Sequence, residues 1–168
     1  MTDYNVDIIM PNFNKSLYIK ESIYSVINQT YKNWRLIIID NCSVDNSKKI
    51  LSEFKDFGKI KLIFLKKNMG AAFSRNLGLR VANSKFIAFL DSDDYWTKNK
   101  LSDQISEMKE KDLDFTYTDY TPFVLKNNIK KFNKCVSPKD SYSFLEYIND
   151  TSIATSSMII KKSVISTI

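Results

Sequence analysis

The 168-residue chain is 43% hydrophobic and 13% aromatic and carries a formal net charge of +6, a composition typical of a globular domain rather than a disordered segment. It contains no histidine and only two cysteines, Cys42 and Cys135, which excludes imidazole metal sites and a disulfide framework and leaves oxygen ligands for any metal. The sequence shows neither an apolar run long enough to span a membrane nor a secretory signal pattern, so we expect a cytoplasmic protein.

The basic balance is compatible with three kinds of partner: nucleic acid, an anionic membrane surface and a phosphorylated small molecule. The lysines are scattered, and the short clusters LKKN at 65–68 and IKKF at 129–132 are not long basic arms. No zinc-finger or RNP-type motif accompanies them, so we expect no nucleic-acid binding. Peripheral association with the inner face of a membrane stays open.

The first part of the chain alternates strands and helices four times. The predicted strands are Val6–Met10, Trp34–Asp40, Ile60–Leu65 and Phe86–Leu90. Each is followed by a segment with helical periodicity, at 16–27 with Ser16 as its N-cap, 44–54, 68–82 and 98–111. Because the strands are apolar on both faces, the pattern predicts an open, mostly parallel α/β sheet covered by helices on both sides.

The pattern changes after residue 114. We expect a strand in 115–120, an exposed hairpin or loop at 126–132, a short helix in 141–150 and a strand in 156–163. No linker rich in Gly, Pro or Ser separates this part from the sheet, so residues 1–168 are expected to form a single domain.

Polar clusters follow every predicted strand. They are PNFN at 11–14, DNCSVDN at 40–46, KKNMGAAFSRN at 66–76 and DSDD at 91–94. Singly, they are also explained as a turn, a helix cap or a loop in which Gly70 has positive φ. In open α/β sheets, however, ligands bind outside the carboxyl ends of the strands, and four clusters at that edge favour a ligand site.

The DSDD cluster contains three carboxylates, Asp91, Asp93 and Asp94, directly after an apolar strand. Either Asp93 or Asp94 is enough to cap the following helix, so three carboxylates are an excess. They repel one another, and a divalent cation held by two of them relieves that repulsion, with a diphosphate as the natural source of further oxygen ligands. No dinucleotide-binding or P-loop glycine motif is present, which disfavours a Rossmann dehydrogenase and a P-loop nucleotidase.

These motifs, in this order and spacing, resemble the family-two inverting nucleotide-sugar glycosyltransferases with the GT-A fold. The resemblance runs in register from Val6 to Leu101 and more loosely to Lys162. It implies a Rossmann-like sheet in which residues 1–113 bind the nucleotide sugar and 114–168 begin the acceptor side. It also implies metal-assisted transfer of a sugar, with inversion, from a UDP-sugar to a glycan or lipid-linked acceptor hydroxyl in cell-surface polysaccharide biosynthesis.

The donor-binding residues that the resemblance implies are Pro11, Asn12, Phe13, Asn14, Asp40, Asn41, Asn68, Gly70, Arg75, Asp91, Ser92 and Asp93. Phe13, where the family usually has Tyr, is expected to stack on the base, and Asn41, where the family has a second acid, can still bond to uracil. Arg75 is expected near the pyrophosphate. Asp93 is the implied direct ligand of Mn²⁺ or Mg²⁺, and Asp91 contacts the metal or the ribose.

The general base of the family belongs to a later stretch that this sequence does not reach, so the base is expected beyond Ile168. We therefore expect a C-terminally truncated domain whose acceptor half is incomplete. The alternative hypothesis is a non-catalytic module that binds a nucleotide sugar. A sugar-phosphate nucleotidyltransferase would need a Gly-rich basic loop after the first strand, which PNFNKS lacks.

Overall fold

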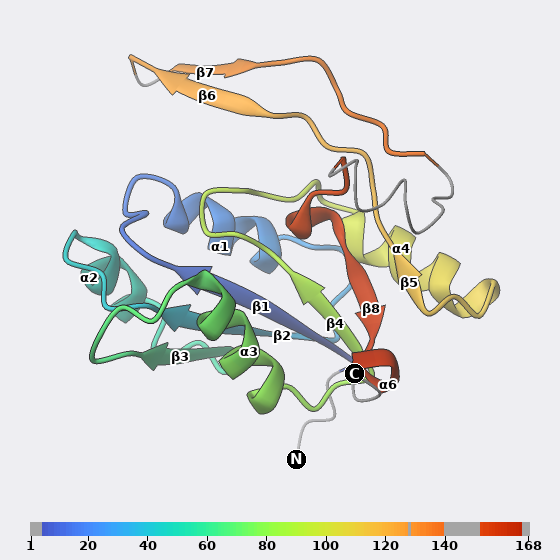
Figure 1. Cartoon of the computed structure of the whole chain (residues 1–168), viewed down its shortest axis with the longest axis horizontal. Helices are drawn as coiled ribbons and strands as arrows, with labels where there is room; N and C mark the ends of the chain where they lie inside the picture. Colours follow the sequence, from blue (N-terminus) through green and yellow to red (C-terminus); the bar gives the residue numbers. More distant parts are fainter. Residues whose placement is uncertain (1–4, 128, 140–151, 166–168) are drawn as a thin grey trace.

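The computed structural model describes residues 5–127, 129–139 and 152–165 and contains a six-stranded sheet, flanking helices and a separate two-stranded hairpin (Figure 1). The strands of the main sheet are β1 (Val6–Asn12), β2 (Trp34–Asp40), β3 (Ile60–Phe64), β4 (Phe86–Phe89), β5 (Phe115–Thr116) and β8 (Ile159–Lys161). The hairpin consists of β6 (Phe123–Lys126) and β7 (Ile129–Phe132). The helices are α1 (Ile19–Ile27), α2 (Ser47–Ser52), α3 (Ala71–Val81), α4 (Lys100–Glu110) and α6 (Lys162–Ile165), with a 3₁₀ turn, η1 (Thr155–Ser157).

The main sheet has the strand order β3-β2-β1-β4-β8-β5. Its first four strands are parallel, whereas β8 runs antiparallel to both β4 and β5. The chain moves outward from β1 to β3 and then returns to β4 on the other side of β1. The strand order therefore reverses between β1 and β4, the position where open α/β sheets bind ligands. The predicted open, mostly parallel sheet is confirmed.

Strand β1 runs two residues further than predicted, through Pro11 to Asn12. Proline has no N–H to donate and is tolerated in a strand only at an unpaired edge. The pairing of β1 with β4 ends at Ile9 and Phe89, so Pro11 pairs on one side only, with Ile39 of β2. The ladder between β1 and β4 ends here because β4 ends at Phe89, and β1 continues to Asn12 beside β2 alone.

Two hydrophobic layers enclose the sheet because alternate residues of each strand point to opposite faces. One layer packs β1 and β2 against α1, α2 and α4 and includes Ile8, Met10, Leu36, Ile38, Ile23, Leu51 and Leu101. The other packs the same strands against α3 and α6 and includes Ile9, Ile37, Ile39, Ile87, Leu77, Leu79 and Ile165. Parallel strands buried on both faces explain the continuous apolar runs of the sequence.

Several predicted boundaries are corrected by the structure. Ser16 does not cap α1, because the helix begins at Ile19 with Tyr18 at its N-cap position and has no side-chain cap bond. The Ser16 N–H donates to Asp45 Oδ2 at 2.9 Å. The strand expected in 115–120 is limited to Phe115–Thr116, and the one in 156–163 to Ile159–Lys161. The helix expected in 141–150 lies outside the described residues. In the part of the chain that the structure describes, none of the helices has the length and apolar character needed to cross a membrane.

Gly78 of α3 lies directly against β1. A Cβ added at this position would lie 2.5 Å from Ile9 Cγ2 and 3.2 Å from Ile39 Cδ1. We expect Gly78→Ala to lower the free energy of unfolding by about 1–3 kcal/mol, because the methyl group overpacks the helix–sheet contact. Gly58→Ala is the matched control, since nothing lies within 4 Å of the position that its methyl group would take. Urea denaturation compares the two, and equal stabilities would contradict the close packing of α3.

Candidate functional site

The loops after β1 and β2 are joined by side-chain hydrogen bonds at the carboxyl edge of the sheet. Asn12 Nδ2 donates to Asp40 Oδ1 at 2.8 Å and to Ser43 Oγ at 3.2 Å. The Ser43 N–H donates to Asp40 Oδ2 at 3.1 Å, and the Asn14 N–H donates to Ser43 Oγ at 3.0 Å. Asn12 and Asp40 are buried. Their side chains therefore fix the positions of the two loops.

A second set of bonds connects the loop after β2 to the loop after β3. Asn41 Nδ2 donates to Asn68 Oδ1 at 2.7 Å, and the Met69 N–H donates to Asn41 Oδ1 at 2.8 Å. The Gly70 N–H donates to Asn68 Oδ1 at 2.9 Å. Gly70 has φ of 86°, a conformation that a side chain would strain, and it leads directly into α3. The structure thus brings Asn41, Asn68 and Gly70 together.

Each carboxylate of the DSDD cluster has a different partner. Asp91 Oδ1 accepts a hydrogen bond from Arg75 Nη2 at 2.5 Å, and Asp93 Oδ2 accepts one from Lys15 Nζ at 2.6 Å. Asp94 Oδ2 accepts one from Ser156 Oγ at 2.5 Å. The positive charges come from α3 and from the loop after β1. Repulsion among the three carboxylates is therefore offset by two cations and a hydroxyl group.

The pKa values of Lys15 and Asp94 are both raised, for different physical reasons. The hydrogen bond with Asp93 raises the pKa of Lys15, although partial burial opposes the shift. Burial raises the pKa of Asp94, and the nearby charges of Asp93 and Asp91 add to the shift, while the bond from Ser156 opposes it. Asp91 and Asp93 lie at the accessible edge of the cluster, with side chains 32% and 39% exposed. Asp91 and Asp93 are therefore accessible to a ligand at the edge of the sheet, and Asp94 lines the cavity beside it.

The idea that Asp93 or Asp94 caps the next helix is wrong. Helix α4 begins at Lys100, and its N-cap is Asn99. No motif of the sequence pointed to Ser156, which donates to Asp94 and also accepts the Asp91 N–H at 3.0 Å. Ser156 lies in η1, far along the chain, and only the return of β8 beside β4 brings it to the cluster.

The predicted donor-binding residues form a buried group and an accessible group. The buried group fixes the loops and consists of Pro11, Asn12, Asp40, Asn41 and Ser92. The accessible group consists of Phe13, Asn14, Asn68, Gly70, Arg75, Asp91 and Asp93. Phe13 is 41% exposed, so part of its ring is accessible to a ligand, as are the similarly exposed rings of Phe64 and Phe73. Only the accessible group can contact a ligand without rearrangement.

A hard divalent cation fits the donor atoms at this edge. Among the described residues, no three Asp, Glu or Cys side chains converge on a common point. Asp91 and Asp93 nevertheless offer carboxylate oxygens, the ligand type that Mg²⁺ and Mn²⁺ prefer, and Mg²⁺ sites commonly use one or two carboxylates with substrate phosphates. Both carboxylates are accessible and are balanced by long, flexible basic side chains. A cation would thus compete with Lys15 and Arg75 for them.

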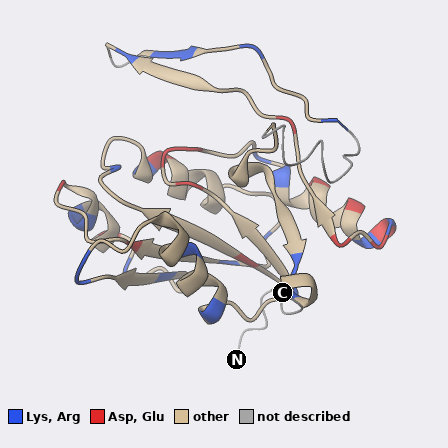
Figure 2. Cartoon of the chain, in the orientation of Figure 1, with Lys and Arg blue, Asp and Glu red and all other residues tan. Residues whose placement is uncertain are grey.

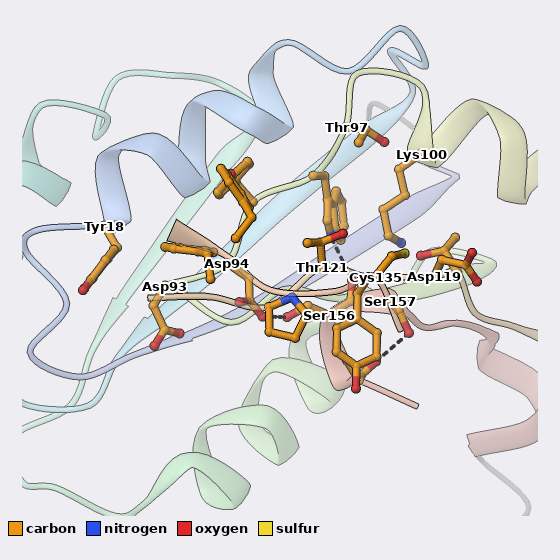
Figure 3. A pocket seen from close by; sticks show the side chains of 18 of the residues that line it. Tyr18, Asp93, Asp94, Thr97, Lys100, Asp119, Thr121, Cys135, Ser156 and Ser157 are labelled. Carbon is orange, nitrogen blue, oxygen red and sulfur yellow. Dashed lines mark hydrogen bonds between the residues drawn. The ribbon is translucent and has the colours of Figure 1, made fainter. Parts of the chain in front are cut away.

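A cavity of about 1120 Å³ adjoins the cluster on the side of the β6–β7 hairpin. Tyr18 and Asp93 lie at one end of it and Lys100 and Asp119 at the other (Figure 3). Its walls include the aromatic side chains Tyr95, Trp96, Tyr120, Phe123 and Phe132. Asp94 and Ser156 line the cavity as well. The cavity therefore opens beside the carboxylates and offers both aromatic and polar surfaces to a second ligand.

Lys100 is the buried cation of this cavity, with 6% of its surface exposed. Its Nζ donates to Gln104 Oε1 at 2.5 Å and lies 4.3 Å from the centre of the Trp96 ring. Burial lowers the pKa of Lys100 to about 7. Its position in the first turn of α4 also disfavours the charged form, because the helix dipole is positive there.

Comparison with known proteins identifies relatives along nearly the whole chain. The family profile described as glycosyl transferase family 2 matches residues 7–168. The chain is 45% identical to the Escherichia coli UDP-Glc:alpha-D-GlcNAc-diphosphoundecaprenol beta-1,3-glucosyltransferase WfgD over 83% of its length and 53% of that protein. It is 32% identical to the putative teichuronic acid biosynthesis glycosyltransferase TuaG of Bacillus subtilis over 94% of its length and 62% of that protein. The chain thus spans little more than half the length of these curated relatives.

Solved structures share the fold. The crystal structure of S. aureus TarS 1–349 aligns with 97% of this chain and with 48% of the TarS chain, with a TM-score of 0.76 and 22% sequence identity. The structure of TarS 1–349 in complex with UDP-GlcNAc aligns with 66% of this chain and 33% of the TarS chain, with a TM-score of 0.63 and 29% sequence identity. These likenesses agree with the open α/β architecture described above.

Proposed function

Because the chain belongs to glycosyl transferase family 2, we propose that its carboxyl-edge site binds a nucleotide diphosphate sugar for transfer to an acceptor hydroxyl. The observation that carries this proposal is the pairing of Asp91 with Arg75 and of Asp93 with Lys15 at the point where the strand order reverses. Such an alternation of accessible carboxylates and cations suits a diphosphate and the divalent ion that accompanies it.

The nucleoside would lie over the loops after β1 and β2. Phe13 offers an exposed ring for stacking on the base, while the buried bonds of Asn12, Asp40 and Ser43 keep its loop in place. We infer a uridine nucleotide, in agreement with the UDP-glucose donor in the name of the E. coli relative and the UDP-GlcNAc bound in the TarS complex. Asn68 and Gly70 would border the same part of the donor.

The diphosphate would lie between the cations and the carboxylates. Mn²⁺ or Mg²⁺ would be held by Asp93, with Asp91 as its second protein contact, and would supply Lewis-acid stabilisation of charge on the leaving diphosphate. Once these carboxylates have another partner, Arg75 and Lys15 are able to turn toward the phosphate oxygens. The planar guanidinium of Arg75 can donate two parallel hydrogen bonds to a phosphate, whereas Lys15 acts as a point charge.

The acceptor would enter the cavity under the β6–β7 hairpin. Its aromatic walls suit the apolar faces of sugar rings, and Asp94, Lys100 and Ser156 supply polar contacts. We propose a lipid-linked acceptor and transfer with inversion at the inner face of the membrane, in cell-surface polysaccharide biosynthesis. The support is the name of the E. coli relative, which specifies a diphosphoundecaprenol-linked acceptor.

Calorimetric titration with UDP tests the donor site. We expect Phe13→Ala to weaken UDP binding about twofold to tenfold, because the stacking contact of the base is lost. Binding of inorganic pyrophosphate, which has no base, should not change. Tyr24→Ala is the control, since Tyr24 is similarly exposed at 46% but packs against Phe54 of the segment after α2. Equal UDP affinities of the two variants would contradict the placement of the nucleoside at Phe13.

A further inference from the structure

The outer face of the β6–β7 hairpin combines aliphatic and basic side chains. Val124 pairs with Lys131, and Lys126 pairs with Ile129. Directly opposite residues of an antiparallel pair lie on the same face, so these four side chains share one face. All four are exposed, with Val124 at 54% and Ile129 at 64%. On the outer face, two aliphatic and two cationic side chains therefore alternate.

The inner face attaches the hairpin to the body of the protein. The Phe123 ring lies 5.6 Å from that of Tyr95 and 6.0 Å from that of Phe132, measured between ring centres. Lys130 Nζ lies 4.0 Å from the centre of the Tyr95 ring and forms an ion pair with Glu21 of α1. These contacts fix which face points inward, so Val124, Lys126, Ile129 and Lys131 are presented to the outside.

The charge of this segment is one-sided. From Thr121 to Pro138 the chain contains four lysines and no Asp or Glu. Figure 2 shows the hairpin as an arm with blue and no red segments, projecting away from the main sheet. Within the described residues, Lys126, Lys131 and Lys134 form no ion pair with a carboxylate. These three exposed lysines are therefore available to an anionic partner.

We propose that the outer face of the β6–β7 hairpin docks on an anionic lipid bilayer. Exposed aliphatic side chains interleaved with lysines match the boundary between acyl chains and anionic headgroups, where apolar burial and electrostatic attraction add. The lysines approach the headgroups while Val124 and Ile129 enter the layer below them. The match in both charge and apolarity favours a membrane surface over an acidic protein, which would satisfy the lysines alone.

The position of the hairpin gives this docking a consequence for the acceptor. Phe123, Leu125 and Phe132 line the cavity beside the carboxylate cluster. Docking of the outer face would hold the hairpin between that cavity and the bilayer, and so keep the cavity close to the surface at which the diphosphate of a lipid-linked acceptor lies. This consequence rests on the proposed function, whereas the docking itself does not.

Sedimentation with vesicles tests the docking on the full chain without nucleotide. We expect binding to vesicles of phosphatidylcholine mixed with phosphatidylglycerol, weaker binding at high salt and little binding to phosphatidylcholine alone. Lys126→Glu/Lys131→Glu should lower the partition coefficient at least about 25-fold, since each lysine near such a surface contributes about fivefold. Val124→Ser/Ile129→Ser should also weaken binding. The control, Lys48→Glu/Lys49→Glu on the exposed side of α2, makes the same change of net charge and should have a much smaller effect.

Two results would overturn the proposal. One is equal loss of vesicle binding in the hairpin and α2 charge variants, because only net charge would then matter. The other is an absence of vesicle binding by the wild-type chain. Self-association through the hairpin, measured by light scattering, in a chain that does not bind vesicles would be one form of this result. UDP titration of the same variants separates this proposal from the donor site, since their UDP affinity should equal that of the wild type. If the wild-type chain bound vesicles but did not bind UDP, only the donor-site assignment would be contradicted, and the docking proposal would stand.

Discussion

Asp7→Ala is expected to lower the free energy of unfolding by about 3–5 kcal/mol, the cost typical of removing one partner of a buried ion pair. The Asp7 side chain is fully buried on β1 and accepts hydrogen bonds from Arg35 Nε at 2.7 Å and Arg35 Nη2 at 2.9 Å. Its Oδ2 also accepts the N–H groups of Asn83 and Ser84, at 2.7 Å and 2.9 Å. The substitution therefore removes an acceptor shared by two N–H groups of Arg35 and two backbone N–H groups, although Arg35 Nη2 keeps its hydrogen bond to Asn83 Oδ1 at 2.8 Å. Urea denaturation near neutral pH measures the loss.

Acid should remove the same stabilisation in the wild-type protein. Burial raises the pKa of Asp7, but the hydrogen bonds of Arg35, Ser84 and Asn83 outweigh that effect and leave the pKa below its usual value. Because the pKa of Asp7 is lower in the folded than in the unfolded state, its ionised carboxylate stabilises the fold at pH values above the unfolded-state pKa of about 3.9. This stabilisation is lost as the pH falls through the folded-state pKa. The stability difference between wild type and Asp7→Ala should therefore shrink below about pH 4.

The control for this experiment is Glu107→Ala. Glu107 of α4 also pairs with a basic residue, Lys111, but its side chain is 48% exposed. Exposed pairs contribute about 0–1 kcal/mol, so this variant should stay close to the wild type. A loss at Asp7 no larger than the loss at Glu107 would show that the Asp7–Arg35 pair does not secure β1 to the start of β4.

Asp93→Ala is expected to abolish the dependence of UDP binding on Mn²⁺. In the presence of the metal, the variant should bind UDP at least about 10–100-fold more weakly than the wild type, the loss that even indirect metal partners typically cause. In chelator the two proteins should bind UDP with similar, lower affinity, because Asp93 makes its contribution through the cation. Calorimetric titration under both conditions measures the difference.

Asp103→Ala provides the control for the metal experiment. Asp103 is an exposed carboxylate of α4 that lines the same cavity but lies outside the DSDD cluster. Its removal changes the net charge by the same amount and should leave the metal dependence intact. If Asp93→Ala retained the full Mn²⁺ enhancement, the assignment of Asp93 as a metal ligand would be wrong.

Periodicity and apolar runs were sufficient to predict the sheet. Trp34–Asp40 forms a strand over the predicted range, and the other three parallel strands begin at the predicted residues. Strands buried on both faces carry a signal that depends only on local composition. The position of the polar clusters was predictable for the same reason, since the end of a buried strand is visible as the end of its apolar run.

The partners within the site were not predictable from local sequence. Arg75 could have been a solvated charge of α3, and its pairing with Asp91 depends on how α3 packs across β1. Ser156 reaches Asp94 because β8 pairs beside β4, a long-range contact that no periodicity encodes. The division of the donor residues into buried and accessible ones has the same origin. Asn12, Asp40 and Asn41 carry the expected polar groups, but packing directs them to one another and to neighbouring loops.

The existence of the β6–β7 hairpin was predictable from the sequence, but its register was not. The exposed hairpin or loop predicted at 126–132 is confirmed by β6 and β7. Which side chains face outward depends on register, because a slip by one residue exchanges the two faces. The observed pairing of Phe123 with Phe132 settles this and separates the aromatic inner face from the basic outer face.

The most direct test of the donor site is a crystal structure of the protein with UDP and Mn²⁺, with anomalous data collected at the manganese edge. We predict one manganese peak within coordination distance of an Asp93 oxygen, at about 2.0–2.3 Å, with the diphosphate on its far side and Lys15 and Arg75 turned from the carboxylates to the phosphates. UDP bound away from the carboxyl edge of β1 and β4, or manganese bound without contact to Asp93 or Asp91, would contradict the central claim.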